Sequence, residues 1–195
     1  MGDLSADVAR MHATFLSGAE TSRLRKISFA LLNSELHSVA AYRFGRYAGM
    51  VRARSRLLAL PLIILHRIWN RWITHIHHCE ISVNARIGSG FLLMHRHGVT
   101  IGPATIGKNV VLHQNVTIGQ RAAGGDQGVP HIGDNVWIGP GATIVGAITI
   151  GDGATISAGT VLSRDVPAHA LAGGVPGRVL SLDYDNTAML GYLPS

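Results

Sequence analysis

The sequence predicts an α+β protein in which an N-terminal helical region is followed by a parallel β-helix with one extruded loop. An aliphatic residue recurs at every sixth position late in the chain, a Gly-rich stretch interrupts this period, and the first 78 residues lack it. The regular positions are Ile132, Ile138, Ile144, Ile150, Ile156 and Leu162. Such a period is typical of a parallel β-helix, in which each six-residue unit forms one short strand and one turn, with the aliphatic side chain inside.

The same period can be followed backwards through two interruptions. The earlier positions are Ile81, Ile87, Leu93 and Val99, then Ile106, Leu112 and Ile118. The step from Val99 to Ile106 is seven residues, which predicts one inserted residue. Residues 120–130 have no apolar period, so we predict that they form a loop outside the coil. Insertions in solenoids commonly form the binding face, which favours a site beside this loop over an insertion without a role.

Before the coil, apolar spacing predicts helices over residues 5–18, 22–50 and 55–77, with Pro61 bending or starting the last. The composition changes at Cys79, so we divide the chain into a helical region (1–78), a β-helix domain (79–180) and a C-terminal tail (181–195). A coil of this kind has exposed sides and ends and usually needs capping or association. We therefore expect an oligomer.

The basic charge belongs to the helical region. Residues 1–78 hold eleven Lys or Arg against four Asp or Glu, giving +7, and the remainder holds six against seven, giving −1, which together make +6. The basic, apolar segment 51–78 could contact an anionic membrane surface. We favour a helix packed on the coil or on a sister subunit, and the apolar run 57–69 is too short for a span. Few aromatic residues and no recognition motif argue against nucleic-acid binding.

Cysteine content and the start of the chain bear on its location. Cys79 is the only cysteine, which excludes an internal disulfide and a cysteine-based zinc cluster. The first residues show no basic and then apolar signal segment, so we expect a cytoplasmic protein.

Four strings in the coil carry a family resemblance. They are VTIG at 99–102, HQNVTIG at 113–119, GVPHIGDNVWIG at 128–139 and AGGVPGRV at 172–179. On these strings the chain resembles the hexapeptide-repeat acyltransferases, in particular the serine O-acetyltransferase-like branch that includes versions from polysaccharide gene clusters. The resemblance implies a left-handed coil, a homotrimer or a dimer of trimers, and acetyl-CoA as the acetyl donor.

The expected chemistry needs a base, because the acceptor hydroxyl loses its proton as its oxygen attacks the thioester. Neutral histidine suits this task. His95 aligns with the catalytic histidine of the family and is our first candidate. His97 is the second, since residues two apart on a strand share a face, and His131 is the third, because a functional histidine of serine acetyltransferases follows this loop.

The acceptor side departs from the family pattern. Met94 stands where serine acetyltransferases carry a carboxylate that would pair with the serine ammonium. The stretch from Asp126 to Pro130 holds neither the Arg nor the second histidine that the family has there. We assign Met94, His113 and Asp126 to substrate binding, although a structural role is equally consistent for His113. Because a thioether cannot neutralise an amine, a sugar hydroxyl or another alcohol is the alternative to free serine.

The donor side matches the family more closely. The resemblance places the pantetheine arm and nucleotide beside small residues and one cation. These are Gly139, Ala158, Gly159, Ala172, Gly173, Pro176 and Arg178. We expect direct transfer in a ternary complex, with backbone amides near the loop holding the oxyanion and without a covalent acetyl-enzyme.

Two other function classes share the coil. A zinc hydratase of the γ-carbonic-anhydrase type carries a His-x-x-x-x-His pair, which is absent between His95 and His131, so no metal is expected. A non-catalytic scaffold would not need both His95 and the 173–178 tail.

Overall fold

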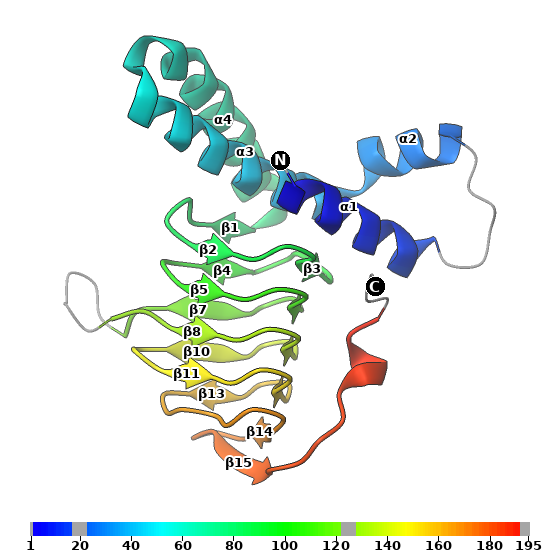
Figure 1. Ribbon diagram of the computed structural model, residues 1–195, viewed down its shortest axis with the longest axis vertical. Coiled ribbons are helices and arrows are strands. Elements are labelled where there is room, and N and C mark those ends of the chain that lie inside the picture. Colours follow the sequence, from blue (N-terminus) through cyan, green and yellow to red (C-terminus); the bar gives the residue numbers. More distant parts are fainter. Residues whose placement is uncertain (1, 17–22, 122–127, 192–195) are drawn as a thin grey trace.

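The protein is described by a computed structural model, which describes residues 2–16, 23–121 and 128–191. Four helices precede a stack of short strands, and Figure 1 shows the helices lying across the N-terminal end of the stack. The helices are α1 (Gly2–Phe15), α2 (Arg23–Leu32), α3 (Ser34–Arg54) and α4 (Arg56–His77). None of the helices in the described part of the chain combines the length and apolarity needed to cross a membrane.

The predicted helix over 22–50 is wrong, because the chain forms two helices that meet at Asn33. The Asn33 backbone is extended, and its side-chain oxygen accepts a hydrogen bond from the Leu36 amide at 2.7 Å. This is an N-cap, so α3 begins here. Ser55 caps α4 in the same way, and Pro61 therefore lies inside α4 instead of starting it.

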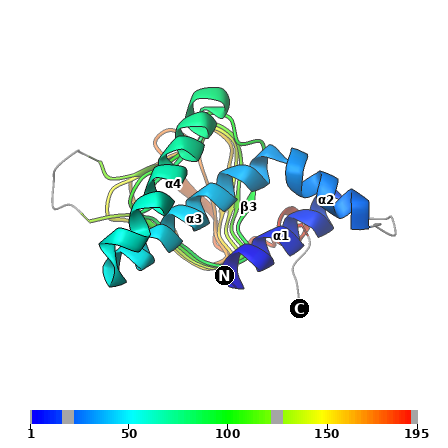
Figure 2. The same ribbon diagram turned by 90° about the horizontal axis from the view of Figure 1, so that it is seen from above.

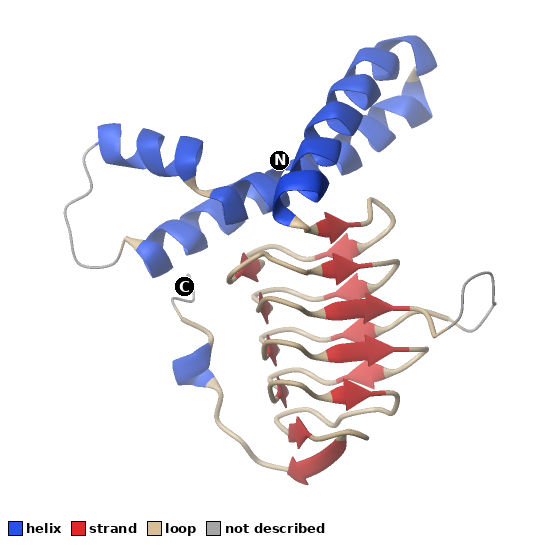
Figure 3. Ribbon diagram, turned by 180° about the vertical axis from the view of Figure 1, so that it is seen from behind, coloured by secondary structure: helices blue, strands red, loops and turns tan. Residues whose placement is uncertain are grey.

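The strands form three parallel sheets, one for each side of the coil, as Figure 3 shows from behind. The first sheet contains β1 (Glu80–Ile81), β4 (Thr100–Ile101), β7 (Thr117–Gly119), β10 (Thr143–Val145) and β13 (Val161–Leu162). The second contains β2 (Arg86–Ile87), β5 (Thr105–Ile106), β8 (His131–Ile132) and β11 (Thr149–Ile150). The third contains β3 (Leu92–Leu93), β6 (Val111–Leu112), β9 (Trp137–Ile138), β12 (Thr155–Ile156), β14 (Leu171–Gly173) and β15 (Arg178–Ser181), the last antiparallel to β14.

The aliphatic residues of the six-residue period stack inside the coil. Ile87, Ile106, Ile132 and Ile150, for example, are direct partners in consecutive strands of the second sheet, and all are buried. One predicted position is wrong: Ile101, and not Val99, pairs with both Ile81 and Ile118. Val99 is also buried but lies at the corner before β4. The extra residues therefore lie earlier, in the turn after Leu93.

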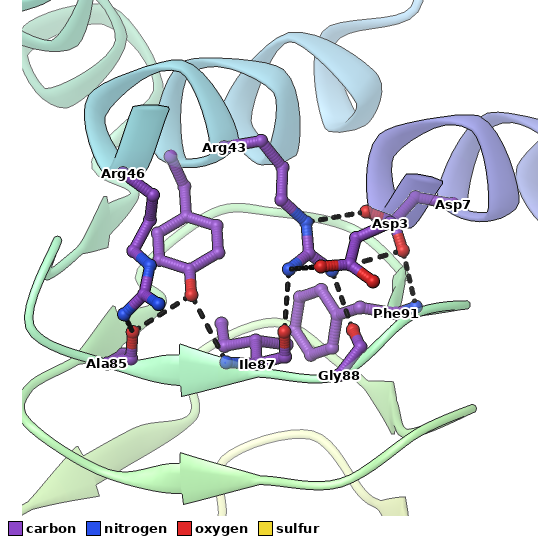
Figure 4. Close-up of polar contacts among 9 residues, drawn as sticks. Asp3, Asp7, Arg43, Arg46, Ala85, Ile87, Gly88 and Phe91 are labelled. Atoms are coloured by element: carbon purple, nitrogen blue, oxygen red, sulfur yellow. Dashed lines mark hydrogen bonds and ion pairs between the residues drawn. The ribbon is translucent and has the colours of Figure 1, made fainter. Parts of the chain in front are cut away.

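The helices cap the carbonyl groups of the first coil (Figure 4). Strand amides donate to carbonyls of the following coil, as Arg86 N does to Ala104 O. The carbonyls of Ala85, Ile87 and Gly88 in the first coil accept instead from side chains of the helices. Tyr42 and Arg46 donate to Ala85 O at 2.9 Å, and Arg43 donates to Ile87 O and Gly88 O at 2.6 Å. Part of the basic charge of the helices is therefore used to satisfy buried backbone groups.

Asp7 and Arg10 join α1 to the same end of the coil. Asp7 accepts hydrogen bonds from Arg43 and from the Phe91 amide. The buried Arg10 guanidinium donates to Gly90 O and to Leu190 O. Leu190 follows a short 3₁₀ helix (Thr187–Met189) in the C-terminal segment, which returns along the coil to α1 (Figures 1 and 2). Both ends of the described chain thus meet beside β3.

Candidate active site

One edge of the coil brings together the predicted acceptor and donor residues. The inward residues of the third sheet are partners in register, namely Leu93, Leu112, Ile138, Ile156 and Ala172. The residues that follow them therefore lie above one another, in the order Met94, His113, Gly139, Ser157 and Gly173. Repetition of the coil thus builds a continuous ridge with histidine near its N-terminal end and small residues towards its C-terminal end.

His95 lies in the turn between β3 and β4, at the N-terminal end of this ridge. Its side chain is exposed, and its backbone has a φ of 57°, in the left-handed region. Its ring centroid is 6.5 Å from that of His113. The prediction that His95 and His97 share a strand face is wrong, because both belong to the turn. The ring of His97 instead lies 6.4 Å from that of His77 on α4.

His113 forms the second layer of the ridge. Its ring lies 5.0 Å from that of Trp137 on β9. Burial lowers the pKa of His113 below its usual value, and the neighbouring His95 adds to this effect. At neutral pH the imidazole of His113 is therefore uncharged and able both to donate and to accept hydrogen bonds.

This pKa shift predicts a pH-dependent stability. Because the folded protein binds a proton at His113 less readily than the unfolded chain, the free energy of unfolding should fall as the pH drops below about 6.5. His113→Gln, which cannot titrate, should weaken this dependence. Urea unfolding at several pH values between 5 and 7.5 would measure it, and an unchanged slope in the variant would show that other histidines cause the effect.

A hollow of about 320 Å³ opens beside His113. Its walls come from the third sheet, from the end of α1 and from the C-terminal segment. The lining residues are Thr14, Leu92, Met94, Val111, His113, Trp137, Ala188, Met189 and Gly191. None of these described lining residues is acidic, so the hollow offers apolar and aromatic surface with one neutral imidazole. Trp137 was not predicted from the sequence, although its place one residue before the inward Ile138 could have indicated it.

His131 is not brought to this edge within one chain. It is exposed on β8 in the second sheet, where its neighbours in register are Thr105 and Thr149. Asp126 lies outside the described residues. The structure of a single chain therefore groups His95, His113 and Met94, and separates them from His131.

The predicted donor residues occupy the lower part of the same edge. A Cβ atom on Gly139 would lie 2.7 Å from Ala158 N and 2.9 Å from Ile156 O, so only glycine fits there. Ala158 and Gly159 are exposed in the next turn, and Gly159 has a φ of 67° with open space around it. Pro176 and Arg178 are exposed at the last turn and on β15. The Ala172 side chain points into the coil, where it is fully buried.

The possible metal ligands of the described residues do not gather at one place. In the parts of the chain that the structure describes, no three His, Cys, Asp or Glu side chains are grouped so as to hold a metal ion. Cys79 is buried, and burial raises its pKa to about 11. Its thiol is therefore a poor nucleophile.

The coil of stacked six-residue repeats is the architecture of hexapeptide-repeat proteins. Residues 130–164 match the family model described as bacterial transferase hexapeptide (six repeats). The serine acetyltransferase of Bacillus pumilus is 37% identical over 155 residues, which cover 79% of this chain and 67% of that protein. The chain belongs to the serine acetyltransferase family of hexapeptide-repeat proteins.

Solved structures agree with this assignment. Soybean serine acetyltransferase complexed with serine has a TM-score of 0.71 and 34% identity, covering 92% of this chain and 68% of that one. Serine acetyltransferase from Brucella abortus in complex with coenzyme A has a TM-score of 0.72 and 25% identity, covering 93% and 68%. The predicted fold class, helices followed by a left-handed parallel β-helix, is confirmed. The chain spans about half the length (50% and 54%) of other curated serine acetyltransferases that it matches.

Proposed function

We propose that the protein is an acetyl-CoA-dependent O-acetyltransferase of the serine acetyltransferase type, which moves an acetyl group to an alcohol hydroxyl. One observation carries this proposal: His95 lies at the head of an edge that continues through Gly139, Ala158 and Gly173. This arrangement supports the proposal, because a candidate base lies in line with a strip of small residues along which an extended thioester could lie. The relatives named as serine acetyltransferases, and the neighbour solved with coenzyme A, support the same activity.

The proposed mechanism is direct transfer. His95 takes the acceptor hydroxyl proton while the oxygen attacks the thioester carbonyl, and collapse of the tetrahedral intermediate breaks the C–S bond. The imidazolium returns the proton to the leaving thiolate, which gives the ester and free CoA. The amides of Gly139 and Gly159 already donate to Ile156 O and Pro140 O. Because those two amides are engaged, the proposed donors to the oxyanion remain other backbone amides near the loop.

A second acceptor class is favoured by the hollow beside His113. Free serine carries an ammonium group, and no described residue that lines the hollow has a carboxylate to pair with it. Met94 and Trp137 instead offer the kind of surface on which the apolar face of a sugar ring packs. A sugar or another neutral alcohol is thus the alternative acceptor.

Thiol release from acetyl-CoA, measured with L-serine and with a panel of sugars and small alcohols, tests both proposals. Strong release with serine would show that serine binds without a carboxylate at position 94. Release only with another alcohol would assign the enzyme to the second class. No release with any acceptor would contradict the transferase proposal and favour a scaffold.

We also propose that the functional unit is a homotrimer or a dimer of trimers, in the cytoplasm as predicted. His131 lies on β8 of the second sheet, whereas His95 lies in the turn that follows β3, so a neighbouring copy would be needed to bring a His131 to the site. Helix α4 presents a further surface for association. Its outer face carries exposed apolar side chains, namely Leu57, Leu58, Leu60, Ile64, Leu65, Ile68, Trp72 and Ile76.

Introducing charge on this face should disrupt the assembly. Leu65→Glu with Ile68→Glu is expected to lower the oligomer mass in sedimentation velocity, because two apolar contacts become buried charges. Arg67→Glu with Arg71→Glu changes the charge of the same helix without removing apolar area. It should therefore lower the oligomer mass less than the first variant does. An unchanged mass in the first variant, together with loss of binding to anionic vesicles, would instead assign the face to a membrane surface.

A further inference from the structure

Arg96, between the two turn histidines, ties the turn to the helical region. Its side chain is only 11% exposed. One terminal nitrogen donates to Glu35 Oε1 at 3.1 Å, and the other lies 2.6 Å from His77 Nδ1. Glu35 belongs to the first turn of α3, and His77 is the last residue of α4. The guanidinium therefore joins the turn to two helices at once.

The rest of the turn is fixed to the next coil. Met94 N donates to Leu112 O at 2.7 Å, and Asn115 N donates to His97 O at 2.8 Å. Gly98 has a φ of 70°, and a Cβ atom there would lie 2.2 Å from Asn115 Oδ1. His95 is thus held from both sides in a backbone conformation that non-glycine residues seldom adopt, and such a conformation persists only where the surroundings impose it.

The chemistry of this cluster requires a neutral His77. A guanidinium has no acceptor, so Nδ1 of His77 must accept the hydrogen bond and the proton must lie on Nε2. Burial lowers the pKa of His77, and Arg96, His97 and His37 lower it further, while Glu35 opposes them. The two terminal nitrogens of the planar guanidinium can donate to Glu35 Oε1 and His77 Nδ1 at the same time. The single ammonium of a lysine cannot donate to both in the same geometry.

The polar contacts named above for this turn are made by its backbone and by Arg96, and none of them involves the His95 ring. We propose that Arg96 is a positioning residue, which with Glu35 and His77 holds the backbone of residues 94–98 so that His95 faces the edge of the coil. This inference rests on the proposed function, in which His95 is the base.

Kinetics of Arg96→Ala, Arg96→Lys and Glu35→Gln would test the proposal. Because misplacing a catalytic group by about 1 Å can cost about 100-fold, Arg96→Ala is expected to lower kcat roughly 10- to 100-fold, with KM for acetyl-CoA nearly unchanged. The kcat of Arg96→Lys should lie between that of Arg96→Ala and that of the wild type. Guanidinium added to the solution should restore part of the kcat that Arg96→Ala loses. Arg86→Ala removes an exposed arginine from the same coil and serves as the control. A wild-type kcat and pH profile in Arg96→Ala would overturn the proposal.

A second measurement separates this inference from the proposed function. Titration of His77 by NMR should show a raised pKa in Arg96→Ala, because the neighbouring cation is gone, and hydrogen exchange should quicken in residues 94–98. If the wild type transfers no acetyl group to any acceptor, the proposed function fails. The raised pKa of His77 and the faster exchange would still support the proposal that Arg96 holds residues 94–98 in place. An unchanged His77 titration with unchanged exchange would overturn it.

Discussion

Replacing His95 by asparagine is expected to lower kcat about 100- to 10,000-fold, the usual contribution of a general base. Asparagine is the informative replacement because it tolerates the left-handed backbone that His95 adopts, with its φ of 57°. The fold of the turn is therefore kept while the group that takes the proton is lost. Steady-state thiol release at saturating acetyl-CoA would measure the change.

His169→Asn is the matched control. His169 is also exposed, has the same φ of 57° and lies in a later turn of the coil, away from the edge that carries His95. Its replacement should leave kcat within about two-fold. His97→Asn and His131→Asn complete the series, since both were candidates from the sequence. A larger loss in either one than in His95→Asn would reassign the base.

The regular part of the coil could be predicted from the sequence because its information is local. An inward aliphatic residue recurs at every sixth position over many coils, and this period is typical of a β-helix. The corners need residues that accept a left-handed backbone, as Asn109, Asn115 and Asn135 do. The error at Val99 arose because both Val99 and Ile101 are buried. Only the pairing between coils distinguishes the stacked residue from the corner residue.

The contacts of the helical region could not be predicted in the same way. Arg43 is read from the sequence as part of the basic excess of residues 1–78, and Arg96 only as the residue after His95, yet each has partners far along the chain. Nothing near Arg96 in the sequence indicates Glu35 or His77. The sequence therefore indicated candidate residues that the repeat positions, such as His95, His113 and Gly139, but it could not indicate the contacts that the helices make.

Replacing Asp7 by alanine is expected to reduce the free energy of unfolding by roughly 3 to 5 kcal/mol, the usual cost of removing one partner of a buried ion pair. The Asp7 side chain is fully buried, 2.9 Å from Arg43 Nε, and it also accepts from the Phe91 amide at 2.8 Å. Burial raises the pKa of Asp7, while the hydrogen bonds from Arg43 and Phe91 oppose this. Removing the carboxylate takes the acceptor from the Phe91 amide and the buried acidic partner from Arg43, which keeps only the exposed Asp3 as an ion-pair partner. Urea unfolding would measure the loss.

Asp3→Ala provides the control, because Asp3 lies one turn earlier on the same helix and faces the same guanidinium. It is 3.7 Å from Arg43 Nη1, but its side chain is 60% exposed, so its loss should cost less than about 1 kcal/mol. If Asp7→Ala and Asp3→Ala lost equal free energies of unfolding, burial would not explain why the ion pair of Asp7 contributes more. Hydrogen exchange would show where the fold weakens: the Phe91 amide should lose protection in Asp7→Ala. The amides of β9, which donate to carbonyls of the next coil, should keep theirs, because their partners do not involve the helices.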